Sequence, residues 1–121
     1  DAPLEVLADV GRLEQALSNL IANALRFTPE GGEVRVTARA VPEGVRLDVT
    51  DTGVGLSPED QARVFDRFFK QDASRRRGGT GLGLSIVRAI AQAHGGTATV
   101  RSAPGQGSTF SVTIPVQGKS E

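Results

Sequence analysis

The stretch Gly-Gly-Thr-Gly-Leu-Gly-Leu-Ser-Ile-Val at residues 78–87 constrains the fold of this chain more than any other. A glycine inside a helix costs about 1 kcal/mol relative to alanine. Four glycines within residues 78–83 therefore favour a loop whose backbone another group can approach closely. Apolar residues then recur at helical spacing from Leu82 to Ala93, and Gly95-Gly96 ends the pattern. A glycine loop that opens a helix exposes backbone N–H groups at the positive end of the helix dipole. The stretch therefore predicts an anion site, most commonly for phosphate.

Two well-known phosphate loops fit this stretch poorly. A dinucleotide-binding fingerprint should follow an apolar strand, whereas Ser74-Arg75-Arg76-Arg77 precedes the glycines, and no Gly-Lys-Ser/Thr marks a Walker loop. A flexible surface loop is the alternative interpretation of the glycines taken alone. The predicted phosphate site therefore depends on agreement with other parts of the chain.

Composition limits the classes of protein to which the chain can belong. Its 121 residues have the size of one domain, and 14 Lys and Arg balance 14 Asp and Glu, which predicts no overall attraction to nucleic acid or to an anionic membrane. No apolar run approaches the roughly 20 residues that span a bilayer, so we expect a soluble chain. The absence of cysteine and the single histidine exclude disulfides and metal sites built from either residue.

Residues 10–25 carry a clear helical pattern. Apolar residues recur at spacings of three and four, and a narrow polar arc opposite them holds Gln15, Asn19, Asn23 and Arg26. A solvated surface is the usual interpretation of such an arc. However, asparagine costs about 0.5–0.7 kcal/mol relative to alanine within a helix, and solvated faces are usually filled by Glu, Lys or Gln. Two asparagines one turn apart beside a cation therefore favour a ligand site.

Alternating apolar and polar residues predict two hairpins, one early and one late in the chain. Strands are expected at residues 33–40, 45–50, 97–101 and 108–115, the first two half-buried, with a short edge strand at residues 4–7. Residues 57–60 carry a serine cap, a proline and two acids that predict a short helix. This order predicts a mixed sheet with helices on one face.

Other features adjoin these elements. The second strand runs into Asp51-Thr52-Gly53-Val54-Gly55-Leu56, where the glycines let the backbone pass close to a ligand while Asp51 points into it; a turn cap is the alternative for Asp51. Residues 70–79 lack any apolar residue larger than alanine, which predicts a mobile basic loop, and residues 117–121 are expected to be disordered. His94, beside a glycine at a helix end, is expected to be a cap rather than a catalyst.

Four segments together resemble the motifs of sensor histidine kinases. Residues 19–24, 51–56, 65–70 and 79–85 resemble the N box, the first glycine box, the F box and the second glycine box, in that order. The resemblance covers nearly the whole chain and implies the catalytic and ATP-binding domain. The implied fold is an α/β (α+β) two-layer sandwich of the Bergerat type, a mixed, mostly antiparallel sheet of about five strands with three helices on one face. Residues 1–116 would form the domain, with an ATP lid at about residues 66–80.

The resemblance implies roles for the polar arc of the first helix. Asn23 would coordinate Mg²⁺ that bridges the ATP phosphates, Asn19 would orient that metal site, and Arg26 would contact phosphate. Many family members carry Lys where this chain has Arg26, so the charge is kept while the side-chain geometry differs.

The resemblance also implies an adenine pocket. Phe27 would pack on the base, at a position where Tyr is common. Asp51 would accept a hydrogen bond from the adenine amino group, and Thr109 would support Asp51 through water. Gly53 and Gly55 would make room for the base.

A third implied group surrounds the phosphates, in the lid and at the start of the following helix. The nucleotide-binding residues expected in this group are Lys70, Gly79, Thr80, Gly81, Leu82 and Gly83.

The implied function is that of half an enzyme. The chain would bind ATP and present its γ-phosphate to a histidine on a separate helical dimerisation domain of the parent kinase, with a response regulator downstream. The sequence contains no H box, and His94 matches the Ala-His-Gly-Gly that often follows the second glycine box. The domain would be cytoplasmic, whether or not the parent is membrane-anchored, with no direct membrane or nucleic-acid contact.

Two alternatives stay open. Serine kinases and ATP hydrolases of the same superfamily usually carry a glutamate as general base where Asn19 stands, and an amide cannot take a proton from water or serine. A non-catalytic nucleotide-binding or docking module is the other alternative, and the intact motifs argue against it.

Overall fold

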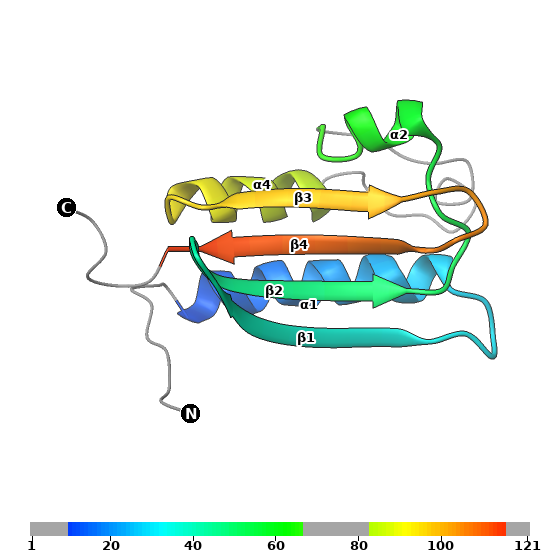
Figure 1. Cartoon of the computed structure of the whole chain (residues 1–121), viewed down its shortest axis with the longest axis horizontal. Coiled ribbons are helices and arrows are strands. Elements are labelled where there is room, and N and C mark those ends of the chain that lie inside the picture. The colour runs from blue at the N-terminus through cyan, green and yellow to red at the C-terminus, as the bar shows by residue number, and fades with distance from the viewer. Residues whose placement is uncertain (1–9, 67–82, 116–121) are drawn as a thin grey trace.

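The computed structural model of the chain describes residues 10–66 and 83–115. These residues form an antiparallel sheet with strand order β1-β2-β4-β3 and helices on one face (Figure 1). In chain order the elements are α1 (Val10–Phe27), β1 (Val34–Val41), β2 (Gly44–Asp51), α2 (Pro58–Arg63), α4 (Gly83–Ala93), β3 (Thr97–Ser102) and β4 (Ser108–Ile114).

The observed elements follow the predicted ones closely. Both hairpins form, and α1 continues two residues beyond the predicted end at residue 25. Ser57 caps α2 as predicted, because its hydroxyl accepts a hydrogen bond of 3.1 Å from the Asp60 N–H. The described sheet has four strands where about five were expected, and the strand expected at residues 4–7 lies outside the described residues.

The core lies between the inner face of the sheet and helices α1 and α4. The largest fully buried side chains are Leu20 on α1, Val49 and Val112 on the central strands, and Val87 on α4. Phe65 closes the core beside α2, with its ring edge-to-face against Phe110 at 6.0 Å between centroids. The predicted apolar faces of both helices therefore pack on the predicted apolar faces of the strands.

Strand β1 differs from its expected half-buried state. Its inward Val36 is 45% exposed, and most of the strand is exposed on both faces. The reason is position, because β1 is the edge of the described sheet, while α1 packs mainly on β2 and α4 packs on β3 and β4 (Figure 1). Alternation along a strand predicts which side chains share a face, but not whether a helix covers that face.

Candidate functional site

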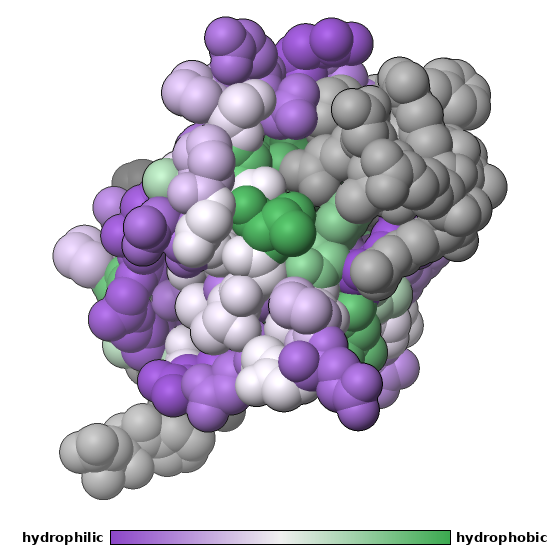
Figure 2. Space-filling model, turned by 90° about the vertical axis from the view of Figure 1, so that its right-hand side faces the viewer, coloured by the Kyte–Doolittle hydropathy of each residue, from purple (hydrophilic) through white to green (hydrophobic). Residues whose placement is uncertain are grey.

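The candidate residues gather at one end of the molecule. The C-terminal end of α1, the loop after β2 and the loop between β3 and β4 meet there (Figure 1). Seen from that end, a small hydrophobic area lies among weakly polar and hydrophilic residues (Figure 2). Val54, in the loop after β2, is 52% exposed.

Asp51 is the buried charged group of this end. Its side chain is 5% exposed, and the Gly53 N–H donates a hydrogen bond of 2.8 Å to its Oδ1. Burial raises the pKa of Asp51 above its ordinary 3.8, while hydrogen bonds from the Gly53 and Ser108 N–H groups oppose that rise. Among the residues that the structure describes, Asp51 has no ion-pair partner. Two backbone donors leave this carboxylate with unused acceptor capacity.

A hydrogen-bond network around Ser102 holds the loops beside Asp51 together. The Ser102 hydroxyl accepts from the Leu56 N–H at 2.8 Å, donates to the Gly107 carbonyl at 2.7 Å and lies 2.8 Å from the Ser108 hydroxyl. Gly107 has a φ of +75°, and a Cβ there would overlap with the carbonyl oxygen of Asp51. The β3–β4 loop can therefore seat Ser108 next to Asp51 only with glycine at position 107.

The expected support of Asp51 by Thr109 is wrong, and the neighbouring residue takes that place. The register pairs Asp51 with Ser108, whereas Thr109 is paired with Thr50. The Thr109 hydroxyl lies 3.0 Å from that of Thr50, on the opposite face of the sheet. Because successive side chains of a strand point to opposite faces, a choice between adjacent residues cannot be made until the register is known.

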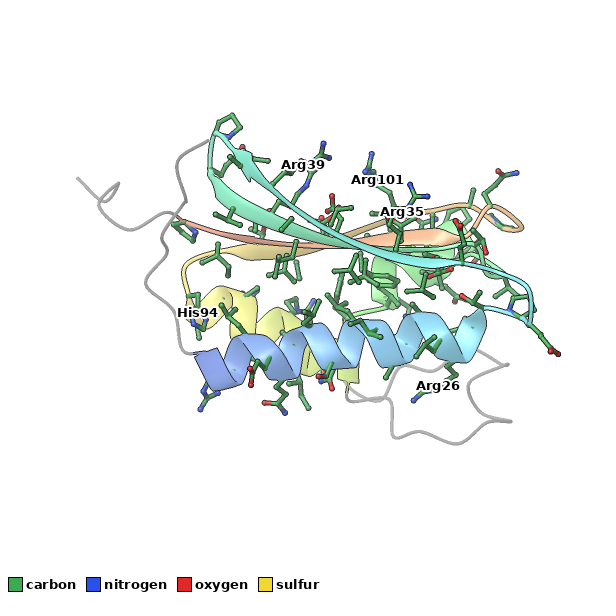
Figure 3. All side chains as sticks on the ribbon, turned by 90° about the horizontal axis from the view of Figure 1, so that it is seen from below. Arg26, Arg35, Arg39, His94 and Arg101 are labelled. Atoms are coloured by element: carbon green, nitrogen blue, oxygen red, sulfur yellow. The ribbon has the colours of Figure 1, made fainter. Side chains whose placement is uncertain are left out.

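The polar arc of α1 reaches the start of α4. The Asn19 Nδ2 donates a hydrogen bond of 3.2 Å to the carbonyl oxygen of Gly83, the first residue of α4. Asn23 and Arg26 follow one and two turns later, and both are half-buried. Figure 3 shows Arg26 on the side of α1 that faces away from the sheet. The arc therefore lies beside the helix start that the glycine stretch predicted.

Phe27 and the loop after β2 are in close contact. A Cβ on Gly53 would overlap with the carbonyl oxygen of Phe27, and a Cβ on Gly55 would overlap with that of Ala103. Both glycines are thus required for close approach of the protein backbone, and room for a base at these positions stays a prediction. The structure brings Phe27, Asp51 and Gly53 together.

Most of the residues that are expected to bind the phosphates lie outside the described part of the chain. Gly83 is described, and a Cβ on it would meet no atom within 4 Å. The other expected residues of that group, which lie outside the described part of the chain, are Lys70, Gly79, Thr80, Gly81 and Leu82.

His94 acts as the predicted helix cap. Its Nδ1 lies 2.8 Å from the carbonyl oxygen of Ile90, at the C-terminal end of α4. That end is opposite to the one that holds Asp51, as the views of Figures 1 and 3 show. This position separates His94 from the candidate site.

Two residues of this site escaped sequence analysis. Ser102 and Ser108 carry the network beside Asp51, yet each is an ordinary strand residue in the sequence. The available signal was Gly107, because a glycine directly before a predicted strand often marks close backbone approach.

A comparison with protein families matches residues 8–118 to the family described as histidine kinase-, DNA gyrase B- and HSP90-like ATPases. The sensor-like histidine kinase SenX3 of Mycobacterium tuberculosis is 48% identical over 119 residues, which cover 95% of this chain and 29% of SenX3. The chain therefore spans less than a third of the length of that relative.

Two solved structures share the fold. The mycobacterial sensor histidine kinase MprB superposes with a TM-score of 0.83 at 34% identity, covering 92% of this chain and 76% of that one. Full-length ShkA in complex with AMPPNP superposes with a TM-score of 0.82 at 43% identity, covering 94% of this chain and 23% of that one. In the described part of the chain, no helix has the length and apolar character needed to cross a membrane.

Proposed function

The chain belongs to the family of histidine kinase-, DNA gyrase B- and HSP90-like ATPases, and from this premise we propose that it is the ATP-binding catalytic domain of a sensor histidine kinase. It binds ATP at the end of the molecule that holds Asp51 and presents the γ-phosphate to a histidine on a separate helical domain of the parent. The similarity to SenX3 and to the nucleotide-bound ShkA over more than nine-tenths of the chain supports this function.

The observation that carries the proposal is the environment of Asp51. A buried carboxylate held by two backbone N–H groups, without a cation among the described residues, can accept a further hydrogen bond. The 6-amino group of adenine is a donor of the required kind. Phe27, at the adjoining end of α1, supplies an aromatic surface on which a base packs.

The phosphate end of the nucleotide is assigned to α1 and the start of α4. Anions bind at helix N-termini because the free N–H groups and the helix dipole favour negative charge, and α4 begins at Gly83 beside Asn19. Arg26 adds a guanidinium group that suits phosphate. The contributions of the lid residues and of residues 79–82 stay predictions.

Mg²⁺ fits this site only together with the phosphates. Among residues 10–66 and 83–115, no group of three or more His, Cys, Asp or Glu side chains could hold a metal ion. Asn23 offers an amide oxygen, which is the hard type of ligand that Mg²⁺ accepts alongside phosphate oxygens and water. When bound, the ion would neutralise phosphate charge.

The chain itself binds and orients the nucleotide and does not transfer protons. Asn19 occupies the position where hydrolases of this superfamily carry a general base, and its amide cannot take a proton. In the transfer, a nitrogen of the acceptor histidine forms a bond to the γ-phosphorus while the bond to the bridging oxygen of ADP breaks. The parent's helical domain supplies that histidine, and a response regulator is the downstream partner. This role places the domain in the cytoplasm.

Calorimetric titration of the chain with Mg·ATP tests the binding step. We expect saturable binding that Asn23→Ala weakens at least about tenfold, because a lost oxygen ligand has to be replaced by water. Gln92→Ala, which removes an exposed amide from the far part of α4, is the matched control and should leave affinity unchanged. Equal affinity in a folded Asn23→Ala variant would remove Asn23 from the site.

Phosphotransfer tests the catalytic step. With γ-labelled ATP the isolated chain should stay unlabelled, and addition of the helical dimerisation domain of a close relative should transfer label to that domain's histidine. His94→Ala should transfer equally well. Stable label on His94 would contradict the half-enzyme interpretation, because the chain would then carry its own acceptor. ATP binding without any transfer to several such domains would contradict the kinase function and favour a non-catalytic nucleotide-binding module.

A further inference from the structure

The outer face of the sheet, which the described helices leave uncovered, carries an unusual concentration of arginine. Figure 3 shows Arg35, Arg39 and Arg101 on the side of the sheet opposite to the helices. The register adds Arg46 to the same face, directly across from Arg39. Asp48 is the carboxylate that the described strands place on that face, so four arginines share the face with one strand carboxylate in a chain whose formal net charge is zero.

Packing on the sheet accounts for only part of this arrangement. Like charges directly opposite each other on neighbouring strands are destabilising, and Arg39 and Arg46 are such a pair. Asp48 offsets their repulsion, since its carboxylate lies 3.2 Å from the Arg46 Nε and 3.6 Å from an Arg39 guanidinium nitrogen. Asp48 is buried and also accepts from the Ser111 hydroxyl. This contact explains why Arg39 and Arg46 are tolerated, but it does not involve Arg35 or Arg101.

Arg35 and Arg101 form the second part of the arrangement. They are the two outer positions of one cross-strand row, in which Thr50 and Thr109 lie between them with their hydroxyls 3.0 Å apart. Arg101 has no ion-pair partner among the described residues, and Arg35 lies 3.6 Å from Glu33 with both side chains at least 70% exposed. Such exposed pairs contribute little and are easily exchanged for another partner.

The spacing of these arginines selects among anionic partners. Four residues along a strand place Arg35 and Arg39 about 13 Å apart, and three strand spacings place Arg35 and Arg101 about 14 Å apart. One phosphate or one small metabolite cannot reach all of them, whereas several carboxylates on one polypeptide can. Among the described residues, the two cross-strand rows that hold these arginines contain no aromatic ring on which a nucleobase could stack and no apolar side chain that could enter a lipid surface. Val41, the apolar residue in register on the same face, is half-buried at the β1–β2 turn.

We infer that the outer face of the sheet docks an acidic segment of a partner protein, with Arg35, Arg101 and Arg39 as its contacts. Arginine suits this task because its planar guanidinium group binds carboxylates through two parallel hydrogen bonds. Of the Thr50 and Thr109 hydroxyls between Arg35 and Arg101, one donates to the other, which leaves one hydroxyl as a further donor for a carboxylate. The docking surface lies on the opposite side of the sheet from the α1 arc, so a docked segment leaves the nucleotide end accessible (Figure 3).

Fluorescence anisotropy of a labelled oligoglutamate peptide, at low ionic strength, tests the docking surface. The double variant Arg35→Glu with Arg101→Glu should weaken binding at least about tenfold, since two exposed charge contacts are reversed. The matched control is Arg12→Glu with Arg63→Glu, which changes the net charge equally at exposed positions of α1 and α2. The control should keep peptide affinity within about twofold.

Further measurements distinguish a local docking surface from a general effect of net charge and from loss of the fold. Arg35→Gln with Arg101→Gln repeats the test without reversed charge, and unchanged Mg·ATP affinity in every variant shows that the fold is intact. An equal loss in the Arg12 and Arg63 control would overturn the proposal, because the attraction would then follow net charge alone. The chain is also tested against single-stranded DNA and against phosphatidylglycerol vesicles. If it binds either of them more tightly than the peptide, and if the Arg35 and Arg101 variant loses that binding, the partner is a nucleic acid or a membrane and the proposal of an acidic segment is overturned.

Discussion

Strand β2 carries two aspartates of nearly equal burial on opposite faces of the sheet, and they have different surroundings. Asp48, 6% exposed, faces outward among Arg39, Arg46 and Ser111. Asp51, 5% exposed, ends the strand, and among the described residues its carboxylate is held by the backbone N–H groups of Gly53 and Ser108, with its pKa raised by burial. A carboxylate surrounded by cations stabilises its neighbours, whereas one held by backbone donors keeps acceptor capacity for a ligand. Burial alone therefore does not distinguish a structural acid from a binding one.

The largest expected effect concerns the backbone that encloses Asp51. Gly107→Ala should destabilise the fold by about 3 kcal/mol or more, because a left-handed alanine is unfavourable and its Cβ overlaps with the Asp51 carbonyl. Gly105→Ala is the matched control, since Gly105 has nearly the same φ and open space around its Cβ, and should cost only about 1 kcal/mol. Urea unfolding of both variants measures the difference, and equal losses would show that close approach is unimportant.

The next prediction distinguishes the roles of Asp51 and Asp48 directly. Asp51→Ala should weaken Mg·ATP binding about a hundredfold, since a buried charged acceptor for the base is lost. Asp48→Ala should keep ATP affinity within about twofold and instead destabilise the fold by about 1–3 kcal/mol, because Arg39 and Arg46 then repel each other without a counter-charge. Calorimetry and urea unfolding test both variants. A loss of ATP affinity in Asp48→Ala would remove the proposed division between the acids.

Base selection sharpens the role of Asp51 further. Guanine presents a carbonyl oxygen where adenine has its amino group, so two acceptors would face each other and ATP should bind about ten- to hundredfold more tightly than GTP. Asp51→Asn should narrow that preference, because an amide can turn a donor toward guanine. Competition titrations with both nucleotides measure the ratio. If the wild-type chain binds both equally, Asp51 is a turn residue and the base contacts lie elsewhere.

The smallest effect is the pH dependence of stability. Because the pKa of Asp51 is raised above 3.8 in the folded chain, the unfolded chain releases this proton at lower pH. The wild-type chain should therefore lose stability relative to Asp51→Asn as pH rises from 3.8 through the raised pKa, with no further change above it. Urea unfolding of both chains across the acidic range measures the difference. A wild-type chain that gains stability over that window relative to the variant would contradict the burial effect.

Much of this organisation could be predicted from local patterns. The spacing of apolar residues placed α1, both hairpins and α4 because each pattern has the period of its element. The same helical period put Asn19, Asn23 and Arg26 on one arc, and the structure ties the first of them to α4. The glycines that follow Asp51 predicted a backbone that passes close to a ligand; in the structure Gly53 and Gly55 lie close to carbonyl oxygens of the protein, and their approach to a ligand stays a prediction.

Contacts between distant segments could not be predicted in this way. The family resemblance implied Thr109 as the support of Asp51, and only the pairing of β2 with β4 shows that the neighbouring Ser108 lies opposite Asp51. The Ser102 network joins residues that lie far apart in the chain, and the glycine at position 107 marks a close approach of the backbone without showing which residues meet there. The exposure of β1 likewise depends on where the helices lie.

The sequence by itself determined the described helices and strands and the family, and it supplied the residue types at the proposed nucleotide end, because each depends on residues close together in the chain. Only the tertiary structure decided which face each strand residue occupies and which side chains meet across strands. It placed Asp48 among arginines and Asp51 among backbone donors, although only two residues of one strand separate them. It also set Arg35 and Arg101 in one row, although they lie far apart in the chain. The physical reason is that strand register and helix coverage are set by the packing of the whole core, which no local pattern contains.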